Sequence, residues 1–126
     1  MPRRQGFWEV RNTLMATRDR LLGTLDLLVL KCLARVGDMH GYGIVNWIQQ
    51  ASEDLLHVEE GSLYPALHRI EQAGWIASEW KATATMRRAR VYRLTAAGRR
   101  QLQREQESWS RVARGVAAVL KQGNAR

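Results

Sequence analysis

The stretch EEGSLYPALHRIEQAGWIASEW, residues 59–80, decides the fold, because it joins a helical pattern directly to an extended one. Apolar residues such as Leu63 and Leu67 recur at helical spacing, and the acidic start of the stretch suits a helix dipole, so we expect a helix here. Gly74 suits the C-terminal cap of that helix. Residues 75–80 then alternate with period two, which is typical of a half-buried strand.

The segments on either side complete a recognisable arrangement. Residues 89–94 also alternate, and small and polar residues at 81–85 separate the two runs, so we expect a hairpin with a basic tip. Upstream, Thr24 is a good N-cap for a buried helix at residues 25–36, and residues 42–51 carry a shorter apolar stripe. Three helices followed by a hairpin form a winged helix-turn-helix, whose third helix enters the DNA major groove.

After the hairpin, Thr95 caps a predicted helix from Ala96 to about Leu120, about 37 Å long at 1.5 Å per residue. Two seven-residue series run along it, Leu102, Trp109, Val116 and Glu105, Val112, Val119. Such a heptad seam either packs on its own domain or pairs with a second helix. Because a three-helix core cannot cover a helix of this length, we expect a homodimer, with these interface residues: Leu102, Trp109, Val112, Val116 and Val119.

The predicted fold class is therefore mainly α with a small β-hairpin, a winged helix-turn-helix followed by a long C-terminal dimerisation helix. Residues 21–95 form the DNA-binding domain, and residues 96–126 form the dimerisation helix and tail. Residues 1–20 carry five arginines and a few apolar residues at helical spacing, so they form either a marginal amphipathic helix or a basic arm. The sequence leaves both readings open.

Composition narrows the class of partner. The chain has 126 residues, 45% of them hydrophobic, which is enough for one compact core. With 20 Lys and Arg against 12 Asp and Glu, the net charge of +8 favours a polyanion, nucleic acid first and an anionic membrane second. The single cysteine, Cys32, lies in an apolar run, and neither a transmembrane run nor a signal peptide is recognisable. We expect a cytoplasmic protein that does not enter membranes.

The residues expected to contact double-stranded DNA fall on the third helix and the hairpin. On the helix, one face is apolar, and polar groups able to reach bases or phosphates lie away from it: Ser62, Tyr64, His68 and Arg69. The hairpin region from 81 to 94 contains five basic residues and no acidic one, a strip suited to phosphates: Lys81, Arg87, Arg88, Arg90 and Arg93. A solvated charged edge strand is the alternative explanation of that strip.

Enzymatic function finds little support. The sequence contains neither Gly-x-Ser-x-Gly nor a Gly-rich phosphate loop, and its histidines, His40, His57 and His68, fall in three different segments. Cys32 in apolar surroundings is more typical of a core thiol than of a redox sensor. We therefore predict no catalytic residue, no metal site and no cofactor.

Several stretches in the same order resemble the PadR family of transcriptional regulators over about residues 20–112. The matching stretches are LGTLDLLVL at 22–30, MHGYGI at 39–44, EGSLYPALHRIE at 60–71 and RRARVYRLTAAG at 87–98. The single helix after the hairpin is similar to the shorter type of this family. Gly43 departs from the family pattern, where a larger polar residue is common, and the segment before Met15 is extra.

The resemblance implies a dimer that binds an operator of dyad symmetry and usually represses transcription. It implies that Gly41 and Tyr42 begin the helix that braces the third one, which adds Tyr42 to the predicted DNA contacts. It also implies that Arg87, Arg88 and Arg90 approach phosphates or the minor groove. Some members of the family bind planar aromatic compounds between subunits, and residues 107–112 resemble the region that those members use. The resemblance therefore implies that Trp109 is either an effector-binding residue or a packing residue of the dimer.

Two other hypotheses remain at this stage. A winged-helix module of the same architecture could bind RNA or a protein partner without operator specificity. The arginine-rich residues 1–20 could instead bring the protein to a membrane surface. Tight binding to one symmetric duplex in the presence of excess random DNA would separate the first hypothesis from operator binding.

Overall fold

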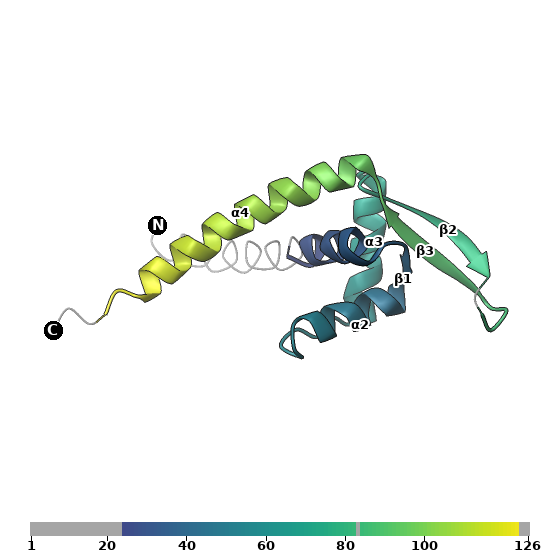
Figure 1. Ribbon diagram of the computed structural model, residues 1–126, viewed down its shortest axis with the longest axis horizontal. Coiled ribbons are helices and arrows are strands. Elements are labelled where there is room, and N and C mark those ends of the chain that lie inside the picture. Colours follow the sequence, from purple (N-terminus) through teal and green to yellow (C-terminus); the bar gives the residue numbers. More distant parts are fainter. Residues whose placement is uncertain (1–23, 83, 124–126) are drawn as a thin grey trace, which may run out of the picture.

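The computed structural model describes residues 24–82 and 84–123 of the chain. Residues 24–36 are helical, and the chain continues in this order: β1 (Met39–His40), α2 (Gly41–Ala51), α3 (Glu60–Gln72), β2 (Ile76–Ala82), β3 (Arg88–Leu94) and α4 (Ala96–Leu120). In Figure 1 the β2–β3 hairpin extends to one side of the helices, and α4 runs toward the opposite end of the molecule. This is the predicted winged helix-turn-helix with a long C-terminal helix. The predicted arm at 1–20 lies outside the described residues.

The sheet has one strand more than the sequence predicted. Its order is β1-β3-β2, and both pairings are antiparallel. The unpredicted strand β1 places Met39 opposite Tyr92 and His40 opposite Val91. Because β1 leads directly into α2, this pairing fixes the start of α2 against the root of the hairpin.

The core forms where the three short helices meet the sheet and the beginning of α4. Residues 24–36 contribute the largest share, and α3 supplies four buried positions. Fully burying one Leu or Ile side chain contributes about 1.5–3 kcal/mol relative to exposure. The buried set is Leu25, Val29, Leu30, Cys32, Leu33, Ile44, Ile48, Leu63, Ala66, Leu67, Ile70, Ile76, Tyr92 and Leu102.

The end of α3 is closed by a glycine in the left-handed region. Gly74 has φ +84°, its N–H donates to the Glu71 carbonyl at 2.9 Å, and the Trp75 N–H donates to the Ile70 carbonyl at 3.1 Å. This is the hydrogen-bond pattern of a Schellman cap, which only glycine adopts without strain. The predicted C-cap is confirmed.

The same corner also starts α4. The Thr95 hydroxyl accepts from the Gly98 N–H at 3.0 Å and donates to the Gly74 carbonyl at 2.7 Å. A Cβ at Gly98 would overlap the Trp75 carbonyl oxygen, so this position requires glycine for a close approach. The end of α3, the start of β2 and the start of α4 are thereby fixed to one another.

Candidate nucleic-acid interface

The outward face of α3 presents the polar residues that the sequence analysis selected. Tyr64 and His68 are exposed, whereas Leu63 and Leu67 are buried. Ser62 is also exposed but lies on the side of α3 toward the first helix, where it lines a recess with Thr24 and Leu25. Tyr64 is 47% exposed and lies against the start of α2, where a Cβ on Gly41 would come within 2.9 Å of the Tyr64 hydroxyl oxygen. The absence of a side chain at position 41 therefore lets the Tyr64 ring rest on α2.

The first residues of α2 lie beside this face. Tyr42 is 60% exposed, and His40 acts as the N-cap, its Nδ1 accepting from the Gly43 N–H at 3.0 Å. Histidine is not among the residues commonly found at the N-cap, so the sequence carries no signal for this role of His40. Tyr42 and Tyr64 thus present two aromatic rings from the two helices of the helix-turn-helix.

One face of the hairpin continues this surface. Ser78 pairs with Tyr92 and Trp80 with Arg90 across the two strands, so these side chains share a face. At the root of the hairpin that face is buried at Tyr92, and toward the tip it is exposed at Trp80 and the arginines. Trp80 was not among the predicted site residues, although the period-two alternation places it on the same face as Ile76.

The wing groove lies between this hairpin face and the starts of α2 and α3. Its volume is about 780 Å³, and its lining includes four aromatic rings and three arginines: Tyr42, Tyr64, Trp80, Tyr92, Arg87, Arg88 and Arg90. Burial raises the pKa of Tyr92, so its hydroxyl stays protonated at neutral pH. Lys81 does not line the groove, and its Nζ pairs with Glu79 at 3.4 Å on the exposed surface.

Arg90 is held more tightly than the neighbouring wing arginines. Its Nε donates to the Ser78 hydroxyl at 2.9 Å, and its guanidinium lies 3.6 Å from a Glu71 carboxylate oxygen. The Ser78 hydroxyl in turn donates to Glu71 at 2.6 Å. This network, Glu71, Ser78 and Arg90, links the last turn of α3 to the wing.

Arg69, one of the predicted DNA contacts, does not line the wing groove. Its guanidinium pairs with Asp26 of the first described helix at 2.5 Å. Burial nevertheless raises the pKa of Asp26, outweighing the hydrogen bond and the positive charge of Arg69, and Glu105 also raises it. Arg69 therefore connects two helices of the domain, and we leave it out of the DNA contacts proposed below.

The apolar seam of α4 divides into two parts. Leu102, one of the predicted interface residues, is 8% exposed and packs in the core of its own domain. Farther along, the side chains are exposed by about half or more: Trp109 50%, Val112 48%, Val116 52%, Val119 70% and Leu120 78%. The domain covers only the beginning of α4, so the exposed part of the seam begins at Trp109.

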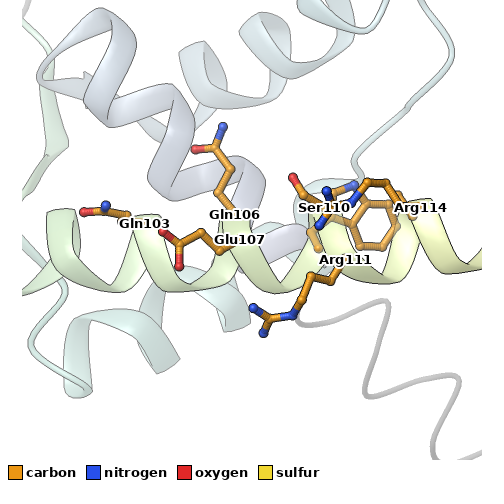
Figure 2. A pocket seen from close by; sticks show the side chains of 8 residues that line it. Gln103, Gln106, Glu107, Ser110, Arg111 and Arg114 are labelled. Carbon is orange, nitrogen blue, oxygen red and sulfur yellow. The ribbon is translucent and has the colours of Figure 1, made fainter.

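A shallow recess follows α4 beside Trp109. Its volume is about 820 Å³, and all of its lining residues come from this one helix. Figure 2 shows Glu107, Arg111 and Arg114 projecting from successive turns of the helix. Apart from Trp109 and Ala113 the lining is polar or charged, so the recess lies on a different face of α4 from the apolar seam of Val112, Val116 and Val119.

Other classes of site are not found in residues 24–82 and 84–123. No group of three or more His, Cys, Asp or Glu side chains there is placed to hold a metal ion. No helix within those ranges is long and apolar enough to cross a bilayer. Cys32 is buried, and burial raises the pKa of its thiol to about 11.

Comparison with known proteins identifies the architecture. The model of the transcriptional regulator PadR-like family matches residues 29–104, which include α2, α3 and both strands of the wing. The transcriptional regulator Rv3488 of Mycobacterium tuberculosis is 37% identical over 79 residues, 63% of this chain and 70% of that protein.

Solved structures agree. A transcriptional regulator from Clostridium thermocellum superposes with a TM-score of 0.73 at 29% identity, covering 82% of this chain and 99% of that one. A PadR family regulator from Eggerthella lenta covers 94% of this chain and 99% of its own, with a TM-score of 0.69 at 27% identity. The chain belongs to the PadR-like family of transcriptional regulators, which bind DNA and are not enzymes.

Proposed function

We propose that this protein binds an operator of dyad symmetry as a homodimer and represses transcription there. The observation that carries the proposal is the wing groove, where arginines and aromatic rings of the wing and α2 lie beside Tyr64 of α3. An α-helix fits the major groove, and side chains on its outer face reach base edges. Ser62, Tyr64 and His68 then contact the major groove, while Arg87 and Arg88 contact the neighbouring phosphates.

The homodimer is supported by the exposed part of the α4 seam. Trp109, Val112, Val116 and Val119 follow a three-four-three spacing, which puts them on one face of the helix. A contiguous apolar face of this kind, exposed in the single chain, marks an interaction site. A second α4 packed against it would bury these residues and present two copies of α3 on the same side.

Repression follows from simple occupancy of promoter DNA. The described residues hold a DNA-binding domain and one long helix, which suffice to exclude polymerase from an operator that overlaps a promoter. A protein with this role acts where the chromosome is, so we place it in the cytoplasm of a prokaryotic cell.

The same interface offers a place for an effector. Trp109 is 50% exposed at the start of the exposed part of the α4 seam, and a partner helix packed on that seam would bring a second Trp109 indole close enough to share a site with it. Offset aromatic stacking contributes about 0.5–1.5 kcal/mol beyond the burial of area. We therefore propose that a planar aromatic compound binds there and changes operator affinity by linkage.

The effector proposal is tested by quenching of tryptophan fluorescence with planar aromatic dyes. Quenching should be largely lost in Trp109→Phe and retained in Trp80→Phe, a matched control that removes a similarly exposed indole, 55% against 50%. Equal quenching in the two variants, or no quenching of the native protein, would contradict the proposal.

Operator binding is tested by fluorescence anisotropy on the duplex upstream of the gene that encodes the protein. We expect a complex that survives a large excess of random duplex, with a Kd of about 10⁻⁸ M or tighter. A scrambled duplex of the same composition is the control. Binding that random DNA or RNA competes away equally would refute operator recognition and favour a sequence-blind winged-helix module.

A further inference from the structure

The exposed indole of Trp80 stands in the middle of the wing face. Its side chain is 55% exposed. The adjacent strand position holds Arg90 and the next residue in the chain is Lys81, so a large apolar side chain at position 80 is not required by packing. Among the described residues, two guanidinium groups lie over its ring: the Cζ atom of Arg88 is 5.9 Å from the ring centroid and that of Arg90 is 5.8 Å from it. Both distances fall within the range of a cation–π contact.

The two arginines differ in what else holds them. Arg90 already contacts Ser78 and Glu71, so part of its charge and hydrogen-bonding capacity is used within the protein. Among residues 24–82 and 84–123, no carboxylate lies within ion-pair distance of Arg88. Arg88 therefore keeps its five N–H donors for an external anion, and the contact that the structure shows for its guanidinium is with the Trp80 ring.

We propose that Trp80 is a positioning residue of the DNA-binding surface, which holds the Arg88 guanidinium in the wing groove ready for a phosphate of the DNA backbone. The proposal rests on the DNA binding proposed above. An exposed arginine side chain with no neighbouring contact loses rotamer entropy when it binds a phosphate. A side chain that already packs on an indole ring loses less rotamer entropy on binding. The ring leaves the edges of the guanidinium open, because the cation–π contact uses only its plane.

A series of contacts also connects Arg88 to α3. Glu71 on α3 contacts Arg90, Arg90 lies over Trp80, and Trp80 lies under Arg88. The orientation of the outer wing arginine is thereby tied to α3. Arg90 acts in this arrangement as a support, and Arg88 as the phosphate contact.

A double-mutant cycle on the full-length protein tests the proposal. Trp80→Leu keeps an apolar side chain in the strand but removes the aromatic ring, and we expect it to weaken operator binding about three- to tenfold, because the released Arg88 side chain must then be ordered when it binds the phosphate. In the Arg88→Ala background the same substitution should cause no further loss. In the Arg87→Ala background, which serves as the matched control, the full loss should reappear.

Salt dependence provides a readout that a purely structural role would not give. Trp80→Leu should leave the slope of log K against log salt unchanged, because every wing cation is retained, whereas Arg88→Ala should reduce it by about 0.9. An equal loss from Trp80→Leu with and without Arg88 would overturn the proposal and make Trp80 a direct DNA contact. A Trp80→Leu protein that binds the operator as tightly as the native one would also overturn it.

A measurement without DNA keeps the proposal falsifiable if Trp80→Leu folds poorly. Ring currents of the indole should shift the Arg88 side-chain NMR resonances in the free native protein. Trp80→Phe, which keeps a smaller ring, should reduce this shift, and an unchanged shift would overturn the proposal. Failure of the native protein to bind any duplex would instead refute the proposed function, so the two failures are distinguishable.

Discussion

At the scale of single residues, Arg69 shows how a distant partner decides what a side chain does. The helical pattern of α3 correctly places Arg69 at the flank of the apolar face, but the pattern contains nothing about Asp26, 43 residues earlier in the chain. Leu102 is a similar case, because its heptad position is right and only the packing of α4 on its own domain shows that it is buried. Sequence periodicity predicts which residues share one face of a helix. It does not predict which other part of the protein packs against that face.

The ion pair of Arg69 leads to a first prediction. The pKa of Asp26 lies above its usual 3.8 mainly because of burial, so ionising Asp26 costs folding free energy as the pH rises through the raised pKa. Asp26→Asn should therefore change the stability by less than about 0.5 kcal/mol. Arg69→Ala leaves the carboxylate without its partner and should cost about 1 kcal/mol, a modest figure because Arg69 is partly exposed.

Urea unfolding of the two variants at pH 7 measures both effects. Operator specificity should stay native in Asp26→Asn, the control that releases Arg69 without removing it. If Arg69→Ala kept native stability but relaxed recognition at a particular base pair, Arg69 would be a DNA-reading residue and its structural role would be refuted.

Cys32 gives a second prediction, on pH. Burial raises the pKa of its thiol from 9.0 to about 11, so the folded state keeps the proton when the unfolded state has lost it. The protonated Cys32 thiol therefore contributes to the free energy of unfolding, fully below pH 9, and this contribution is lost as the pH rises through about 11. At pH 8 a disulfide reagent should react with Cys32 only as fast as the protein unfolds, and fast stoichiometric labelling of the native protein would contradict this.

At the scale of the elements, the sequence predicted the helices, the hairpin and the start of α4 because each has a local signal. Thr95 before α4 and Gly74 at the end of α3 are such signals, and the structure confirms them. Strand β1 was missed because two residues carry no period and the strand exists only by pairing with β3. The wing groove likewise forms only where the hairpin meets the starts of α2 and α3. Its arginines could therefore be predicted from the sequence, but the position of Trp80 beneath them could not.

A third prediction separates the two elements that meet DNA. His68→Ala, on the exposed face of α3, should cost about 1–3 kcal/mol on the operator and little on random DNA, because it removes a base contact. The pair Arg87→Ala and Arg88→Ala should weaken binding to both DNAs and reduce the salt slope by about 1.8. Anisotropy titrations from low to moderate salt measure both quantities. An unchanged salt slope in the double variant would contradict the assignment of the wing to phosphates.

At the scale of the whole molecule, the exposed part of the α4 seam gives a fourth prediction. Trp109→Ala should shift the protein toward monomer in sedimentation at low micromolar concentration, because the indole is the largest apolar group on that face. Operator binding should weaken in parallel, since two half-site contacts then lose their effective concentration. Gln103→Ala, an exposed substitution on the same helix, is the control. A fully dimeric Trp109→Ala protein with native DNA affinity would refute the role of the seam.

Operator binding by a homodimer requires two copies of α3 held over a single duplex, and footprinting tests this most directly. The native protein, on the DNA upstream of its own gene, should protect two half-sites related by dyad symmetry. Their centres should lie about 10 base pairs apart, or a multiple of that, so that both copies of α3 face the major groove on one side. Protection of one isolated half-site by a monomer, or uniform protection without a symmetric pattern, would contradict it.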